Sequence, residues 1–356
     1  MLDLKSLPLP TADEEIWRYS RIDLLQPERF TPSPARTDII DPHGVCSTTA
    51  TSSAVASPDV FAALNAESMN EVRIDVRAGT TLEAPIIITH HIDAGTAALP
   101  RTIVEMGRDA EATVVERFVS AASGVALCVP VLSAHLDDAA RLRYLAVNDL
   151  DTEAWQIGHQ LAEQGRDTSL LLSTVTLGGY YTRARTEARA LGSGSQSRQV
   201  ALYFAAGDQM HDFRVIQSHE APHTSSDLLF KGAVQDHARS VYTGLISIDE
   251  NARQTSAHQT NRNLTLSEGA WAESVPNLDI RTNDVSCSHA STVGPIDAEQ
   301  RFYLESRGVP PEVAERLVVL GFFDEVIDRL PRVDIVDAVR RRVVERLNIA
   351  SEEVRS

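Results

Sequence analysis

Cysteine is scarce in this chain of 356 residues, which contains only Cys46, Cys128 and Cys287. Three widely separated cysteines do not make a disulfide framework, and no Cys-x-x-Cys pair is present to hold zinc or an iron–sulfur cluster within one chain. Long apolar runs are missing as well, so no stretch of about 18 apolar residues could cross a bilayer. The opening residues lack the basic and apolar regions of a secretory signal. These absences predict a protein of a reducing cytoplasm.

Aromatic residues make up only 5% of the chain, and its 33 Lys and Arg are outnumbered by 50 Asp and Glu. The net charge of −17 argues against binding to nucleic acid or to an anionic membrane through bulk electrostatics. A hydrophobic content of 43% is ordinary for a globular protein with a substantial core. Because aromatic residues are few, that core must consist mainly of Val, Leu, Ile and Ala.

The first of three zones covers residues 1–70. Its segment 13–25, DEEIWRYSRIDLL, predicts a short amphipathic helix with Ile16, Tyr19 and Leu24 recurring on one side. The rest of the zone is rich in proline, serine and threonine, and this composition favours an extended linker over packed structure.

The second zone, residues 71–296, consists of short β-branched or alternating segments that predict many strands. A polar residue followed by a small one recurs at the corners between them. These corners are Asp109-Ala110, Asp138-Ala139, Asp167-Thr168, Asp236-His237-Ala238, Glu250-Asn251-Ala252 and Glu268-Gly269-Ala270. Helical periodicity is almost absent, which disfavours βαβ folds. A β-sandwich and a β-solenoid both remain possible, and the recurring corners favour the solenoid.

The third zone, residues 297–356, changes to helical periodicity. Asp297 can cap a first helix that ends at Gly308, and the prolines that follow can open a second helix. The expected apolar stripes are Val313, Leu317 and Leu320 on the second helix, and Ile335, Val336, Val339, Val343 and Leu347 on the third. We expect this zone to cap the open end of the β region, because unpaired edge strands need protection.

A basic cluster, Arg340 to Arg342, lies on the last predicted helix. Two interpretations stay open for it. The arginines are either a solvated helix face near the negative end of the helix dipole or a surface that docks a partner.

The sequence HEAPH at 219–223 fits the HExxH signature of zinc hydrolases, in which His219 and His223 bind zinc and Glu220 is the general base. That chemistry needs a helix, since two histidines four residues apart share a face only at helical spacing. Pro222 would break such a helix, and the flanking residues alternate as strands do. We therefore predict a turn between two strands, with the histidines solvated or hydrogen-bonded.

Cys287 and His289 are two residues apart near the end of the β region. In a strand they would project on the same side and offer a soft and a borderline ligand for iron or zinc. Two ligands do not complete a site, so others would have to come from elsewhere or from a partner. The alternative is a buried structural cysteine beside a histidine with satisfied hydrogen bonds.

Four stretches of the chain resemble the SufB/SufD family: 14–25, 225–248, 257–270 and 284–308. The last stretch contains CSHASTVG, a motif similar to that of the SufD branch of the family. SufB-like chains carry a scaffold cysteine near the position of residues 260–263, and this chain reads TNRN there.

The resemblance implies a right-handed parallel β-helix with helical regions at both ends. It also implies a non-enzymatic scaffold that assembles iron–sulfur clusters with SufB, through the β-helix, and with the ABC-type ATPase SufC, through the C-terminal helices. His289 is then the first candidate for an iron or cluster contact at the SufB interface and Cys287 the second, while Arg340, Arg341 and Arg342 are candidates for ATPase docking.

No cofactor is expected on the chain alone, although iron or a cluster can pass through it in the complex and the role of a flavin stays open. A homodimer is possible when the chain is expressed alone. The alternative functions are a SufB-like paralogue that carries the cluster itself and, more remotely, the zinc hydrolase of His219, Glu220 and His223.

Overall fold

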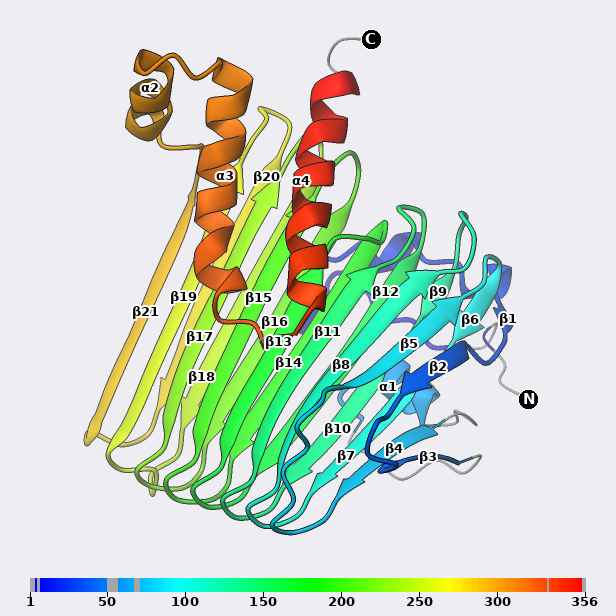
Figure 1. Ribbon diagram of the computed structural model, residues 1–356, viewed down its shortest axis with the longest axis vertical. Helices are drawn as coiled ribbons and strands as arrows, with labels where there is room; N and C mark the ends of the chain where they lie inside the picture. The colour runs from blue at the N-terminus through cyan, green and yellow to red at the C-terminus, as the bar shows by residue number, and fades with distance from the viewer. Residues whose placement is uncertain (1–3, 5–6, 50–56, 67–70, 332, 354–356) are drawn as a thin grey trace.

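The computed structural model describes residues 4, 7–49, 57–66, 71–331 and 333–353. About half of the chain is strand, arranged as a β-solenoid of about eight turns (Figure 1). Successive strands alternate between two sheets, one of twelve strands and one of nine, so that the chain winds round a common interior. The mainly β fold and the solenoid are confirmed, and the sandwich is excluded because most neighbouring strands are parallel.

The twelve-stranded sheet runs in the order β20-β18-β16-β14-β12-β10-β7-β4-β3, with β1, β6 and β9 beside it, and the nine-stranded sheet in the order β2-β5-β8-β11-β13-β15-β17-β19-β21. The strands are β1 (Thr31–Pro32), β2 (Arg36–Ile40), β3 (Cys46–Thr49), β4 (Glu71–Val76), β5 (Ile86–Ile92), β6 (Thr96–Ala98), β7 (Arg101–Met106), β8 (Glu111–Ser120), β9 (Leu127–Cys128), β10 (Val131–Leu136), β11 (Arg141–Asp149), β12 (Trp155–Gln164), β13 (Ser169–Thr176), β14 (Tyr181–Ala190), β15 (Gln196–Ala205), β16 (Met210–His219), β17 (Ser225–Val234), β18 (Arg239–Ile248), β19 (Thr255–Thr265), β20 (Trp271–Ile280) and β21 (Val285–Gly294).

The corners of the solenoid explain the repeat in the sequence. Asp109, Ala139 and Asp167 all have left-handed backbone conformations, with φ of 54°, 62° and 56°. The amide of Asp109 donates to the carbonyl of Asp138 in the next coil at 3.0 Å, and the amide of Asp167 donates to Ser193 at 2.9 Å. Each corner therefore ties one coil to the next.

Three helices follow the last strand: α2 (Ala298–Ser306), α3 (Pro311–Ile327) and α4 (Ile335–Glu353). Figure 1 shows α3 and α4 lying along the outer face of the nine-stranded sheet. Phe323 and Val343 are fully buried there, in one apolar cluster with Leu202 of β15. The helices therefore bury their apolar residues on the outer face of this sheet and do not cap the open end as expected.

The apolar stripe expected for α3 is also wrong in part. Val313 and Leu317 are 41% and 48% exposed, whereas the helix buries Ala314, Val319 and Phe323. On α4, Val339, Val343 and Leu347 are buried as expected. None of the helices in the described ranges is both long enough and apolar enough to span a membrane.

The N-terminal region packs on the other sheet. Residues 14–30, here called the N-terminal strap, form the 3₁₀ turns Glu15–Trp17, Ile22–Leu24 and Pro27–Arg29 instead of the expected amphipathic helix. The expected apolar side is exposed at Ile16, Tyr19 and Leu24. The strap instead buries a different set of residues, namely Trp17, Ile22, Leu25, Pro27 and Phe30.

A further short helix, α1 (Val60–Asn65), is capped by Asp59, whose carboxylate accepts from the amides of Phe61 and Ala62. Strands β2 and β3, which lie in the expected linker, pair antiparallel with β5 and β4. The described part of the first zone is thus packed on the solenoid.

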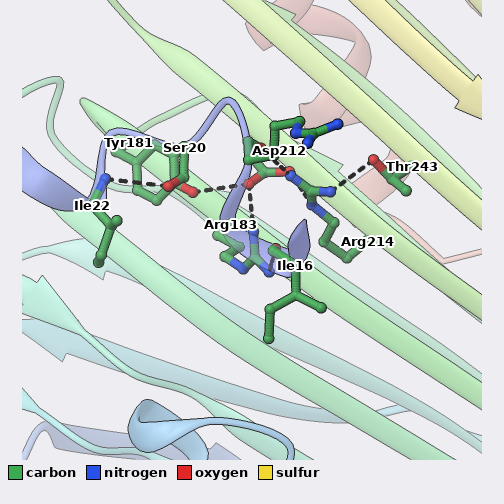
Figure 2. Close-up of polar contacts among 9 residues, drawn as sticks. Ile16, Ser20, Ile22, Tyr181, Arg183, Asp212, Arg214 and Thr243 are labelled. Carbon is green, nitrogen blue, oxygen red and sulfur yellow. Dashed lines mark hydrogen bonds and ion pairs between the residues drawn. The ribbon is translucent and has the colours of Figure 1, made fainter. Parts of the chain in front are cut away.

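A buried charge cluster anchors the strap (Figure 2). Asp212 is fully buried, and its carboxylate accepts from Nη1 of Arg183 at 2.6 Å and from Nε of Arg214 at 2.9 Å. The hydroxyl of Tyr181 donates to the same carboxylate at 2.9 Å. Two arginines and one aspartate leave an excess of positive charge in this cluster.

Backbone carbonyls of the strap complete the cluster. Nη2 of Arg183 donates to the carbonyl of Ile16 at 2.6 Å, and Nη2 of Arg214 donates to that of Arg18 at 2.6 Å. The guanidinium of Arg183 also lies 3.9 Å from the centre of the Trp17 ring. The strap is therefore bound by donors that would otherwise be buried without acceptors.

Replacing Asp212 with asparagine should destabilise the fold strongly, because it leaves two buried guanidinium groups without their carboxylate. We expect a loss of about 3–5 kcal/mol in the free energy of unfolding, measured by urea denaturation. The matched control is Asp279→Asn, which removes the carboxylate of an exposed pair with Arg281 on the same sheet and should have a much smaller effect. Equal losses in the two variants would contradict the role of the cluster.

Candidate functional site

Cys287 and His289 lie in β21, the terminal strand of the nine-stranded sheet. Their partners on β19 are Ala257 and Gln259, which are 0% and 1% exposed and so face the interior of the solenoid. Strand pairing therefore places both candidates on the inner side of the last coil, and the prediction that they share a side is confirmed. No strand follows β21 in the described part of the chain, so this inner face is open.

The thiol of Cys287 is half-buried against Ala257, Ile246 and Ile248. This burial raises the pKa of the thiol, so it is protonated at neutral pH and would have to lose its proton to bind a metal.

The imidazole of His289, by contrast, is exposed, and the described contacts give it no hydrogen bond or ion pair. The alternative interpretation, in which the histidine beside a structural cysteine has all its hydrogen bonds satisfied, therefore does not apply to His289.

The chain provides only part of a metal site at this end. Within the described ranges, no group of three or more His, Cys, Asp or Glu side chains is placed to hold a metal ion. The nearby His258 projects from the outer face of β19, where its Nδ1 lies 2.8 Å from the hydroxyl of Ser288. A thiol and an imidazole suit iron as ligands, and any further ligands must come from outside the described part of the chain.

Sequence reasoning missed Gln259, the strand partner of His289. Its side chain is buried, yet neither its amide nitrogen nor its amide oxygen has a hydrogen-bond partner. Nothing in the sequence marks this residue, because its lack of partners depends on the packing of several coils.

The HEAPH stretch forms the end of β16 and the turn that follows, as predicted. His219 is buried, and its two ring nitrogens are hydrogen-bonded to Thr224 at 2.7 Å and to Ser226 at 2.9 Å. Burial lowers the pKa of His219 to about 4.

The other two residues of this motif point elsewhere. Glu220 forms an ion pair with Arg189 at 3.0 Å. His223 is exposed at a left-handed corner with φ of 59°, and its amide donates to Arg253 in the next coil. Because His219 already uses both ring nitrogens, this stretch is a structural corner and the zinc-hydrolase alternative loses its ligands.

The arginines of α4 do not form a uniform basic patch. Arg342 binds Asp149 of β11 at 2.8 Å, which raises its pKa, and Arg340 pairs with Asp324 of α3. Arg341 is exposed, and the described contacts give it no ion pair. The structure thus assigns two of the three candidates to internal attachment of the helix.

The helices α2 and α3 expose a different kind of surface. Phe302 and Tyr303 are 71% and 58% exposed, and Val313 and Leu317 of α3 are exposed as well. An open groove of about 1100 Å³ adjoins them. It is lined by residues that include Lys231, Arg262, Leu264, Tyr303, Leu317 and Phe322.

The pKa of His219 predicts a pH dependence of stability. Between about pH 6.5 and pH 4 the unfolded chain binds a proton that the folded chain excludes, so the stability is present above pH 6.5 and is lost as the pH falls. Over this window the unfolding free energy of the wild type should fall by up to about 3 kcal/mol more than that of His219→Gln. Urea titrations at several pH values measure this difference.

The matched control is Gln199→Leu, which removes buried hydrogen bonds but no titratable group and should keep the wild-type slope. A His219→Gln variant with that same slope would contradict the assignment.

Comparison with known proteins shows which family this chain belongs to. Residues 88–322 match the family described as SUF system FeS cluster assembly, SufBD core domain. The chain is 37% identical over 222 residues to an iron–sulfur cluster assembly SufBD family protein of Mycobacterium bovis, covering 60% of this chain and 56% of that protein. It is 29% identical over 280 residues to the iron–sulfur cluster assembly protein SufD of Escherichia coli, covering 77% and 66%.

SufD of Bacillus subtilis is 27% identical over 266 residues, covering 74% of this chain and 60% of that protein. The chain thus spans between about half and two thirds of the length of these relatives. Because the family match covers well over half of the chain, the chain belongs to the SufB/SufD family of iron–sulfur cluster assembly proteins.

Proposed function

We propose that this chain is a non-enzymatic scaffold subunit for iron–sulfur cluster assembly in the cytoplasm. It pairs with a SufB-like partner through the last coil of the solenoid and with the ABC-type ATPase SufC through its C-terminal helices. The observation that carries this proposal is the position of Cys287 and His289 on the open inner face of the terminal strand β21, whose second edge has no strand partner among the described residues. Family membership supports the same role.

The open end has the properties of a surface that a partner covers. Leu278 and Ile280 of β20 and Val293 of β21 are each more than a third exposed. Proteins usually protect such edges, and here α2, α3 and α4 lie elsewhere. Pro276 lacks an amide donor in the middle of β20, so β21, which has no proline, is the better strand for a partner to continue.

Iron or a nascent cluster is the cargo in this proposal. Cys287 and His289 supply two ligands from this chain, and the partner supplies the remainder. The SufB-like alternative, in which this subunit carries the cluster itself, is less well supported because Asn261 and Asn263 occupy the buried interior of β19 where a thiol would be needed. Their side chains are already hydrogen-bonded to each other and to Tyr203.

Replacing His289 with alanine should lower the yield of cluster in the reconstituted complex by tenfold or more, because one of two ligands from this chain is lost. Since the side chain is exposed, the fold and the assembly of subunits should be unchanged. The yield is measured from the absorption of the cluster.

His258→Ala, on the outer face of the adjacent strand, is the matched control and should keep the wild-type yield. An unchanged yield in His289→Ala would remove this residue from the site.

The ATPase should dock on the exposed apolar surface of α2 and α3, supported by Arg341. Leu317→Asp places a charge in this surface and should weaken binding of the purified ATPase at least tenfold in calorimetric titration. Arg341→Glu should weaken it less, as expected for a charge at the rim of an interface.

Leu191→Asp is the control, because Leu191 is similarly exposed at a corner of the solenoid. Full affinity in both Leu317→Asp and Arg341→Glu would place the docking surface elsewhere.

A further inference from the structure

Three polar side chains without partners gather in the interior of the solenoid just below the open end. They are Tyr242 of β18, Gln259 of β19 and Ser274 of β20, and the hydroxyl or amide atoms of each are buried with no hydrogen bond among the described residues. Tyr242 is 0% and Gln259 is 1% exposed. Buried polar groups almost always have a partner, so these three side chains need one that the described contacts do not supply.

A glycine brings two of these groups together. A Cβ atom at Gly244 would lie 2.2 Å from Nε2 of Gln259 and 2.7 Å from the hydroxyl of Tyr242. Only the absence of a side chain there lets the amide and the phenol converge. Ser274 is the strand partner of Tyr242, and it borders the same space.

His289 is a group that could complete this arrangement, because it lies in register with Gln259. It pairs with Gln259 in adjacent parallel strands, both facing inward, at the spacing of about 4.8 Å that separates neighbouring strands. The imidazole has no partner in the described contacts, and the Gln259 amide has none. Two unpaired groups in direct strand register can meet through a side-chain rotation.

We propose that Gln259 is the positioning residue of His289 when that histidine binds iron, an inference that rests on the proposed function. The amide oxygen of Gln259 accepts from one ring N–H and leaves the other ring nitrogen free to face the open end. The amide nitrogen of Gln259 donates to the hydroxyl of Tyr242. Metal-bound histidines generally have their second nitrogen held in this way, which fixes the tautomer and the direction of the ring.

The chemical type of this partner also matters. An amide is uncharged, so it orients the imidazole without stabilising the imidazolium, whereas a carboxylate would raise the pKa of the ring. The titratable groups that face this space are Cys287 on β21 and Tyr242 on β18, and the inward residues of β20 from Ser274 to Ile280 add none.

The test uses the reconstituted complex with iron(II) and follows cluster yield against pH. Gln259→Leu should lower the yield about 10–100-fold, the range seen when the residue that holds a metal-bound histidine is removed. In the isolated chain the same change should leave stability unchanged, because no hydrogen bond is lost there. Gln259→Glu should keep the yield at high pH and move the acidic limb of the profile upward by about one pH unit or more.

The matched control is Gln199→Leu, another buried glutamine of the interior. Gln199 is hydrogen-bonded to Thr186 and Gln217, so this variant should be less stable while its pH profile stays that of the wild type. Loss of stability in the isolated Gln259→Leu chain would contradict the unpaired state of the amide. In that case the pH profile of cluster yield in Gln259→Glu would still test whether residue 259 contacts His289.

The outcomes separate this inference from the function on which it rests. If His289→Ala keeps full yield, the proposed site is wrong. If His289→Ala loses yield while Gln259→Leu and Gln259→Glu both behave as the wild type, the site stands and the positioning role is overturned. Water would then be the partner of the three polar groups.

Discussion

Hydrogen bonding between successive coils is the constraint on which the other features of this protein depend. Each coil satisfies its backbone through the coil before it, and the left-handed corners add amide-to-carbonyl bonds along the same axis. Such a stack has no internal reason to stop, so its last strand necessarily carries unpaired groups. The candidate ligands lie on this strand, and no further coil in the described part of the chain covers its inner face.

Much of the architecture could be predicted from local patterns. The β-branched segments around Val114, Leu172 and Leu228 were recognisable as strands, and the polar-small corners indicated a solenoid. Strands β12 and β14 are harder to recognise, because their sequences, WQIGHQLAEQ and YTRARTEARA, are rich in polar and charged residues. Those residues are accommodated by partners distant in the chain, such as the strap carbonyl that accepts from Arg183.

The site was only partly accessible from sequence. The two-residue spacing of Cys287 and His289 sufficed to place them on one side of a strand. The state of Gln259 could not be foreseen, since an unpaired amide is recognised only when every neighbouring group is located. The same holds for the basic cluster on α4, where the charges of Asp149 and Asp324 decide which arginine stays free. Contacts distant in sequence determined each of these outcomes.

The strap and the C-terminal helices also change how the solenoid can unfold. A simple repeat stack behaves as a one-dimensional chain in which any coil can fray. Here the ion pair between Arg342 and Asp149 and the hydrogen bond from Arg214 to Arg18 join residues nearly two hundred positions apart. The helices and the strap that these bonds attach, here called the two clamps, each pack against several coils. The clamped coils should therefore unfold as one cooperative unit. Strand β21 contributes no buried residue to the apolar cluster beneath the helices or to that beneath the strap. The last coil is therefore held mainly by its pairing with β19 and should open more readily than the clamped coils.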